Sequence, residues 1–305
     1  MQRNLWEQFK DAFRQRDNGL IQLILINSII FLVIRLLEVV LALAGLLPTD
    51  IPGYYEVGII YEYLGLPSSL ERLIFRPWTI ITTFFTHYGF FHVLFNMLFL
   101  YWFGTLIKQY LGNQKLVNLY VLGGLAGGAF YILIYNLSPY FTESVTHAGL
   151  IGASAGVLAI VIGAATLMPN HQFHLLLLGP VKIKWIAIFY VISSLFGAIG
   201  QNAGGNIAHL GGCIIGFYYI TQLRKGRDMG GWLQSTLEFL KSFFERPKVK
   251  VTHRGTTTKK ATKSKASGSQ VPQEEIDAIL DKISEKGYES LSKEEKQKLF
   301  NASNK

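Results

Sequence analysis

The stretch GLIGASAGVLAIVIGAATLM, residues 149–168, contains no charged residue and consists mostly of glycine, alanine and aliphatic side chains. A helix of about 20 such residues is long enough to cross a lipid bilayer. One hydroxyl near its start, Ser154, has two possible roles. It is either a small residue that allows helices to pack closely, or a nucleophile held where water is scarce.

The composition of the whole chain agrees with a membrane protein. Half of the 305 residues are hydrophobic and only 16% are charged, against about 25% charged residues in a typical soluble domain. The net charge of +9 comes mostly from the C-terminal third, and such a tail beside membrane helices favours anionic lipid over nucleic acid. One cysteine, Cys213, excludes an internal disulfide and is expected to be a small packing residue.

Apolar stretches of sufficient length recur along the chain, and we expect no cleaved signal peptide before them. They predict an all-α membrane protein with six transmembrane helices, at residues 20–46, 89–108, 115–137, 149–168, 184–200 and 205–224. Arg35 and Glu38, three residues apart in the first span, are expected to pair on one helix face.

The basic residues fix the predicted orientation of these spans. By the positive-inside rule, both termini are expected to be cytoplasmic. The residues on that side are Arg3, Lys10, Arg14, Arg16, Lys108, Lys115, Lys182, Lys184, Arg224, Lys225 and Arg227. The predicted outer loops at 138–148 and 201–204 contain no lysine or arginine.

The segments outside the spans are also distinct. Residues 1–19 form a polar N-terminal segment, and the long first outer loop, 47–88, is expected to be partly helical and to lie in the membrane interface. After the membrane domain of residues 20–225, the sequence predicts three further segments. They are an amphipathic interfacial helix at 229–245, a basic disordered linker at 246–270, and a C-terminal helical hairpin at 271–305 in which Ser292 and Glu295 form a capping box.

Four polar side chains from three predicted spans fall at a similar depth. With a rise of 1.5 Å per residue, His92, Asn96, Ser154 and His209 all lie within roughly 4–11 Å of the outer helix ends. A nucleophile, a base and side-chain donors are the groups that acyl transfer requires. The alternatives are that the serine only packs and that the histidines and the asparagine only cross-link helices.

These positions also carry a resemblance to the rhomboid intramembrane serine proteases, over about residues 70–225. HVLFN (92–96) resembles the family's second-span His-x-x-x-Asn, GASAG (152–156) resembles its nucleophile motif, and AHLGG (208–212) resembles its sixth-span motif. RPWTIITTFFTHYGFFH (76–92) resembles the stretch that leads into the second span. The order and placement of the four motifs make the resemblance specific.

The resemblance implies a role for individual residues. Ser154 matches the nucleophile and His209 the general base of a dyad, while His92, Asn96 and the backbone N–H of Ser154 match the oxyanion hole. Phe95 matches an aromatic position at the substrate entrance. His87 matches a histidine often found ahead of the second span, and we do not expect it to be catalytic.

Some positions depart from the family pattern. Leu158 stands where members often carry an aromatic ring that stacks on the catalytic histidine, and Trp78-Thr79 replaces a Trp-Arg pair, with Arg76 nearby. Lys108 stands where many members carry a glutamate. Gly152 with Gly156 in the fourth span, and Gly212 with Gly216 in the sixth, are expected to form small-residue ridges for close helix contact. Gly152 and Gly156 are expected to bring their helix close to the sixth span, so that His209 reaches Ser154.

The sequence therefore predicts an intramembrane serine endopeptidase that cleaves transmembrane segments of membrane proteins through Ser154 and His209, without a cofactor or metal. The alternative is a non-catalytic rhomboid-like protein that binds client helices in the same groove. Expected partners are transmembrane-helix substrates and anionic lipids, with no nucleic acid. The expected location is a prokaryotic plasma membrane, as a multi-pass protein.

Overall fold

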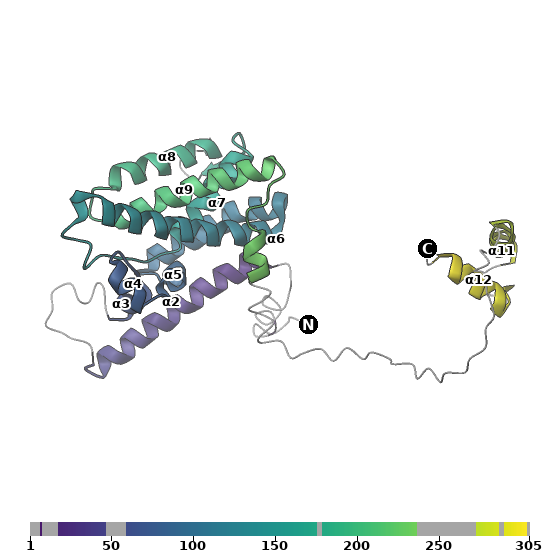
Figure 1. Cartoon of the computed structure of the whole chain (residues 1–305), viewed down its shortest axis with the longest axis horizontal. Helices are drawn as coiled ribbons and strands as arrows, with labels where there is room; N and C mark the ends of the chain where they lie inside the picture. Colours follow the sequence, from purple (N-terminus) through teal and green to yellow (C-terminus); the bar gives the residue numbers. More distant parts are fainter. Residues whose placement is uncertain are drawn as a thin grey trace, which may run out of the picture. The chain divides into compact units, whose positions relative to one another are not determined.

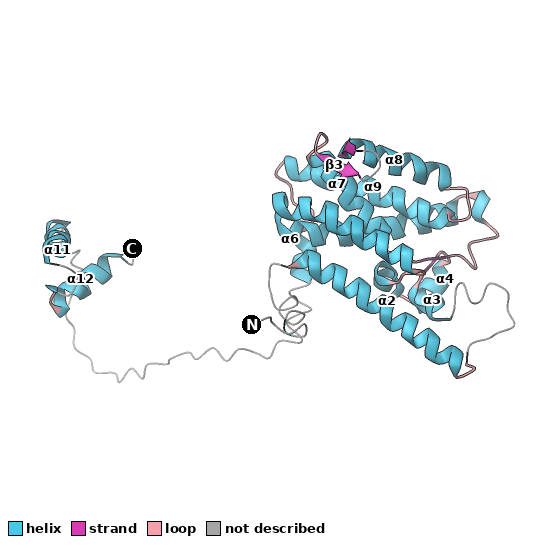
Figure 2. Ribbon diagram, turned by 180° about the vertical axis from the view of Figure 1, so that it is seen from behind, coloured by secondary structure: helices cyan, strands magenta, loops and turns pink. Residues whose placement is uncertain are grey.

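A computed structural model describes residues 7, 18–46, 59–175, 179–236, 273–286 and 290–303 of the chain (Figure 1). The chain divides into two compact units, residues 1–246 and 247–305, which are described separately. Most of the described residues are helical, with short two-stranded ladders besides (Figure 2). The prediction of a mainly α-helical fold is therefore confirmed.

The first unit is a bundle of long helices around one central helix. Helices α6, α7 and α9 pack against one another, α2 packs on α6, and α8 packs on α9 and α7. Every residue of α7 from Ala155 to Ala165 is buried, as expected for a helix that is apolar on all sides. The long helices are α2 (Gly19–Leu43), α6 (Phe90–Leu137), α7 (Ser154–Leu167), α8 (Ile183–Gly197) and α9 (Ala203–Arg224).

Helix α6 covers two of the predicted spans. Gly112, with φ 84° and ψ 164°, is non-helical and divides α6 between the stretches predicted at 89–108 and 115–137. Among the described residues, α2 and α6 are long and apolar enough to cross a membrane, and α7 and α8 are shorter apolar helices. The number of membrane crossings stays a prediction.

The start of α7 differs from the prediction. We expected a helix from residue 149, but Gly149 and Leu150 form strand β2, which pairs antiparallel with strand β1 (Leu66–Pro67). The N–H of Gly152 then donates to the Thr83 carbonyl oxygen at 2.9 Å, and Gly152 has a φ of +126°. These bonds to residues far back in the chain hold the backbone extended, so that Ser154 becomes the first helical residue.

Short helices occupy the described part of the predicted first outer loop. They are α3 (Ile59–Leu64), α4 (Leu70–Phe75), α5 (Thr79–Thr82) and the 3-10 helix η1 (Thr83–Phe85). A second 3-10 helix, η2 (Pro139–Phe141), follows α6, and strands β3 (Gln172–Leu175) and β4 (Gly179–Lys182) form an antiparallel pair between α7 and α8.

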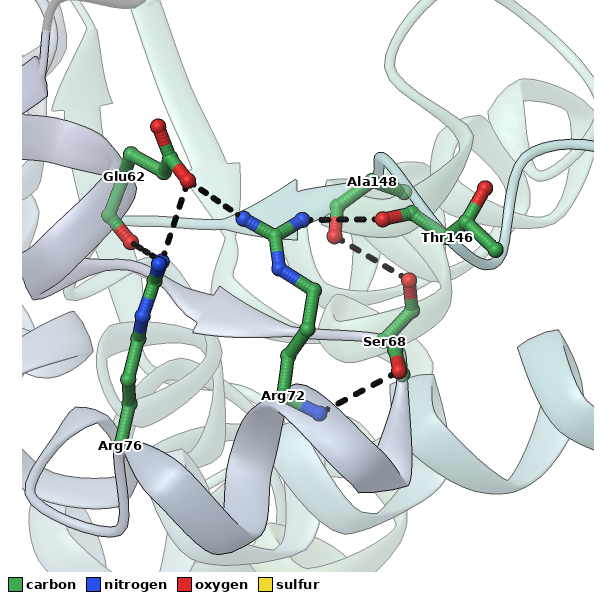
Figure 3. A network of polar contacts seen from close by, with 7 residues as sticks. Glu62, Ser68, Arg72, Arg76, Thr146 and Ala148 are labelled. Atoms are coloured by element: carbon green, nitrogen blue, oxygen red, sulfur yellow. Dashed lines mark hydrogen bonds and ion pairs between the residues drawn. The ribbon is translucent and has the colours of Figure 1, made fainter.

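A polar network ties this loop to the chain that precedes α7 (Figure 3). Arg72 donates to Glu62 Oε1 at 2.8 Å and to the Thr146 carbonyl oxygen at 2.9 Å. Ser68 Oγ donates to the Ala148 carbonyl oxygen at 3.1 Å. Because residues 146 and 148 lie just before β2, the loop helps to position the start of α7.

Trp78 and Arg76, where the sequence lacks the adjacent Trp-Arg pair expected from the family pattern, both contact α3. The Trp78 indole N–H donates to the Tyr63 carbonyl oxygen at 2.8 Å. Arg76 Nη1 donates to the Glu62 carbonyl oxygen at 3.0 Å, and its guanidinium lies over the Tyr63 ring at 4.3 Å. Both side chains therefore anchor α3, in place of an adjacent Trp-Arg pair.

Of the two predicted glycine ridges, Gly212 and Gly216 of α9 bring α7 and α9 together, whereas Gly156 of α7 faces another helix. A Cβ atom at Gly212 would overlap the Ala155 carbonyl oxygen, and one at Gly216 would lie 2.5 Å from the Ala159 carbonyl oxygen. The glycines of α9 thus allow the close approach. A Cβ at Gly156 would instead meet the Tyr120 carbonyl oxygen of α6 at 2.6 Å, which corrects the role expected for Gly156.

The second unit contains helices α11 (Gln273–Lys286) and α12 (Lys293–Ser303). The predicted capping box is confirmed, because the Ser292 N–H donates to Glu295 Oε2 at 2.7 Å and the Glu295 N–H donates to Ser292 Oγ at 3.3 Å. Lys282 pairs with Glu295 at 2.8 Å, and this ion pair joins the two helices.

Several predicted segments lie mostly outside the described residues. In the predicted interfacial helix at 229–245, residues 229–230 form a turn and residues 231–236 are helical. Residues 237–245 and the linker at 246–270 lie outside the described residues. The same holds for most of the N-terminal segment.

The contact between α7 and α9 is testable by substitution. Gly216→Ala should lower the free energy of unfolding by about 1–3 kcal/mol, because the added methyl group must displace the α7 backbone. Thermal unfolding of the detergent-solubilised protein measures the change. Gly231→Ala is the matched control, since this helical glycine has no neighbour within 4 Å of an added Cβ. Equal stability of the two variants would contradict the close approach.

The capping box predicts a pH dependence for the second unit. The hydrogen bond from Lys282, and then that from the Ser292 backbone, lower the pKa of Glu295 from 4.5 to about 2. A depressed folded-state pKa stabilises the fold above the unfolded value, so protection of the α12 amides should fall between pH 4.5 and about 2. Hydrogen exchange on the full chain measures it. Glu295→Gln should flatten this dependence, and an unchanged profile would count against the assignment.

Candidate active site

Ser154 lies at the N-terminus of the central helix. Gly152 and Ala153 turn the chain into α7, and Ser154 is its first residue. Its hydroxyl oxygen lies 2.7 Å from Nε2 of His209 on α9, a residue 55 positions later in the chain. The structure therefore brings together the two residues predicted as a dyad, at hydrogen-bonding distance.

The backbone of α9 holds His209 at this distance. Ala208 is buried, and a Cβ at Gly127 of α6 would lie 2.7 Å from the Ala208 carbonyl oxygen. Together with the contact of Gly212 on Ala155, this packing leaves little room for α9 to move relative to α6 and α7.

His92 lies against the turn before Ser154. A Cβ at Gly152 would stand 2.9 Å from both Nε2 and Cε1 of the His92 ring, and 3.6 Å from Ser154 Oγ. The imidazole of His92 and the hydroxyl of Ser154 therefore flank the same glycine. A side chain at position 152 would separate the imidazole from the hydroxyl. The φ of +126° at Gly152 also favours glycine.

Asn96 belongs to the same face of α6 as His92. Its side chain is 7% exposed, and its amide Nδ2 donates to the His92 carbonyl oxygen at 2.9 Å. An amide nitrogen carries two N–H donors, so this bond within the helix uses one of them.

His87 packs against the ring of His92. It is fully buried, and its ring lies edge-on to the His92 ring at 5.1 Å between centroids. Burial, with a smaller contribution from His92, lowers the pKa of His87 to about 3, so its imidazole stays neutral near pH 7. A neutral, enclosed ring beside His92 fits a packing role.

Sequence reasoning missed one polar residue of this layer. Ser194 of α8 is 2% exposed, and its Oγ lies 3.3 Å from Nδ1 of His209. A signal was present, because Ser194 is a hydroxyl within an apolar stretch and lies three residues before the end of α8, at Gly197. The imidazole of His209 thus bridges the hydroxyls of Ser154 and Ser194.

The remaining predicted positions near Ser154 and His209 differ in their exposure to solvent. Phe95 is 55% exposed and stacks on Phe91 at 6.4 Å between ring centroids. Leu158, one turn after Ser154, is buried inside the bundle, as is Cys213. An aliphatic side chain, that of Leu158, therefore fills the position where family members were expected to carry an aromatic ring.

The structure also contains an apolar pocket of about 370 Å³. It is lined by residues of α6, of the β3–β4 strand pair and of α8. Its lining residues are Phe99, Trp102, Phe103, Phe173, Val181, Trp185, Ile186, Phe189 and Tyr190. None of the residues of the Ser154–His209 cluster lines it.

Comparison with known proteins connects this geometry to a family. Residues 75–226 match the model of the rhomboid domain, and residues 270–305 match a family of unknown function. The second match covers the region of α11 and α12, so it adds no function to that unit.

Individual relatives agree with the domain match. RHOMBOID-like protein 12, mitochondrial, of Arabidopsis thaliana is 32% identical over 161 residues, which are 50% of this chain and 48% of that protein. Rhomboid protease GlpG of Salmonella paratyphi A is 26% identical over 144 residues, which are 47% of this chain and 48% of that protein. The chain thus spans about half the length of these curated relatives.

The relatives carry names from several compartments. They include a presenilin-associated rhomboid-like protein, mitochondrial, of Rattus norvegicus, which is 25% identical over 182 residues, or 56% of this chain and 43% of that protein. The expected location in a prokaryotic plasma membrane is therefore not supported. The domain match, the relatives and the helical bundle together identify the chain as a member of the rhomboid family, whose proteins are embedded in membranes.

Proposed function

We propose that this protein is an intramembrane serine endopeptidase that cleaves transmembrane segments of other membrane proteins. The observation that carries the proposal is the 2.7 Å contact between Ser154 Oγ and His209 Nε2, made by two packed helices inside an apolar bundle. A nucleophilic serine and its general base require such a hydrogen bond between the hydroxyl and the imidazole, and this distance supports that assignment. The name of the bacterial relative, a rhomboid protease, also supports it.

The chemistry follows from the positions of these atoms. His209 Nε2 accepts the hydroxyl proton of Ser154 while Oγ attacks the carbonyl carbon of the scissile peptide bond. The imidazolium then donates that proton to the leaving amine, and the C–N bond breaks. A water molecule then gives a proton to His209 and attacks the carbonyl carbon of the acyl-enzyme. The bond from that carbon to Ser154 Oγ breaks, and His209 returns the proton to Oγ.

The negative charge on the tetrahedral oxygen needs donors that are already in position. The first intrahelical bond of α7 runs from the Val157 N–H to the Ala153 carbonyl oxygen, at 3.0 Å. The N–H groups of Ser154, Ala155 and Gly156 therefore precede the hydrogen-bonded part of the helix. Together with the α7 dipole, these groups, His92 and the second amide N–H of Asn96 are the proposed oxyanion donors.

A membrane setting explains the substrate class. We propose six membrane crossings, with both termini on the side that carries the basic loops and the dyad near the opposite surface. A substrate helix has its carbonyl groups bonded within the helix, so it must unwind locally before Ser154 can attack. Segments with glycine or proline near that surface are the expected substrates.

The basic segment 246–270 suggests a second interaction. Its lysines and arginines, without acidic residues between them, favour anionic lipid at the membrane surface. We propose transmembrane helices as substrates and anionic lipids as binding partners, and no nucleic acid.

Substitution of the dyad tests the proposal directly. Ser154→Ala and His209→Ala should each abolish cleavage of a transmembrane reporter substrate in proteoliposomes, because each removes a group that forms or breaks a bond. A fluorophosphonate probe should label the wild type and leave Ser154→Ala unlabelled. Ser193→Ala, an exposed serine of α8, is the control and should keep full activity.

Two results would count against the protease. Equal cleavage by the wild type and both variants would exclude this site. A folded wild type that binds the reporter without cleaving it, and that no probe labels, would favour a non-catalytic client-binding protein.

The donor set gives a further prediction. His92→Ala and Asn96→Ala should each lower kcat by about 10²–10³-fold, since the oxyanion loses a preorganised donor. KM should change little, because the donors act on the charge that develops in the transition state. Steady-state kinetics with the reporter measure both constants. A kcat equal to that of the wild type in either variant would remove that residue from the proposed oxyanion hole.

A further inference from the structure

The imidazole of His209 has a partner on each of its two nitrogens. Nε2 lies 2.7 Å from Ser154 Oγ, and Nδ1 lies 3.3 Å from Ser194 Oγ. Ser194 comes from α8, whereas the two members of the dyad come from α7 and α9. A third helix therefore contributes a polar contact to the proposed general base.

Ser194 is one of the few buried residues of α8, and it is polar. The buried residues of α8 are Ile183, Ala187 and Ser194. Ser194 is 2% exposed, while the adjacent Ser193 is exposed. A buried hydroxyl requires a hydrogen-bond partner, and the imidazole of His209 is within reach of this one.

A second contact holds this part of α8 on α9. Asn206 Nδ2 donates to the Gly197 carbonyl oxygen at 3.1 Å, less than one turn beyond Ser194. A Cβ at Gly197 would overlap the Asn206 side chain. The end of α8 is thereby attached to the start of α9, which fixes the height of Ser194 relative to His209.

The tautomer of His209 decides whether it can act as a base. A neutral imidazole carries one N–H, and Nε2 can accept the Ser154 proton only if that hydrogen is on Nδ1. Nδ1–H then needs an acceptor, and the hydroxyl oxygen of Ser194 supplies one. After proton transfer both ring nitrogens are donors, and Ser194 Oγ accepts from Nδ1 again.

An acidic side chain from the surrounding helices cannot take this role. The sequences of α6, α7, α8 and α9 contain no aspartate or glutamate. Moving a charged carboxylate from water into this apolar bundle would also cost free energy. The neutral hydroxyl of Ser194 provides an acceptor without that cost.

We propose that Ser194 is a positioning residue that holds His209 in the Nδ1–H tautomer with Nε2 directed at Ser154. The proposal rests on the proposed function, and it extends the two-residue dyad to a hydrogen-bonded chain of Ser154, His209 and Ser194. Ser194 acts through His209, because its hydroxyl contacts Nδ1, the ring nitrogen on the side away from Ser154.

The kinetic test uses the full chain in proteoliposomes with the transmembrane reporter. Ser194→Ala should lower kcat by about 10- to 100-fold, part of the contribution of a general base, and leave KM within about twofold. Ser194→Thr and Ser194→Val form a matched pair of equal shape, of which only threonine keeps the hydroxyl. Threonine should retain more activity than valine, and Ser193→Ala should behave as the wild type.

A spectroscopic readout separates this proposal from the protease assignment. In protein with ¹⁵N-labelled histidine, the His209 signals, identified by their loss in His209→Ala, should report the Nδ1–H tautomer. In Ser194→Ala the Nε2–H form should gain population. A tautomer that depends on Ser194 in a wild type without cleavage would uphold the positioning role and reject the protease.

The opposite combination overturns the proposal. If the wild type cleaves the reporter, and both Ser194→Ala and Ser194→Val are folded with unchanged kcat and an unchanged His209 tautomer, then Ser194 has no positioning role. Equal activity of the threonine and valine variants would likewise show that the hydroxyl is not the feature that matters.

Discussion

The close approach of α7 and α9 is the contact on which the candidate site depends. Gly212 and Gly216 present bare backbone to the carbonyl oxygens of Ala155 and Ala159, so the two helices meet without intervening side chains. Only at such a distance can a serine and a histidine, both with short side chains, share a hydrogen bond of 2.7 Å. Small residues provide this contact in membranes, where close packing replaces the hydrophobic effect between helices.

The polar groups of the site belong to one layer in an otherwise apolar bundle. His92 and Asn96 come from α6, Ser154 from α7, Ser194 from α8 and His209 from α9. Asn96 and Ser194 are buried and the other three are half-buried. Polar groups withdrawn from water need hydrogen-bond partners, and the contacts between the His209 ring and two serines supply them. The packing of four helices thus determines both the geometry and the hydrogen bonding of the proposed chemistry.

The chain before α6 contributes to the site by holding the backbone ahead of Ser154 in place. Thr83 accepts from the Gly152 N–H and donates through its hydroxyl to the Leu150 carbonyl oxygen, at 2.6 Å. The network of Glu62, Arg72 and Thr146 holds the same loop further out. These bonds decide where α7 begins, and with it which N–H groups stay free of intrahelical bonds beside Ser154.

The helical fold and the position of most helices could be predicted from the sequence alone, and the sequence also nominated Ser154, His209, His92 and Asn96 as candidate site residues. Uncharged apolar stretches and short motifs are local features, so they can be read directly along the chain. The N-terminal end of α7, the partners of Gly152 and Gly156, and the contact of Ser194 were decided by the tertiary structure. Each depends on residues far apart in sequence: β1 with β2, Gly212 with Ala155, and Ser194 with His209. Such pairings follow from how the helices pack, which no local pattern encodes.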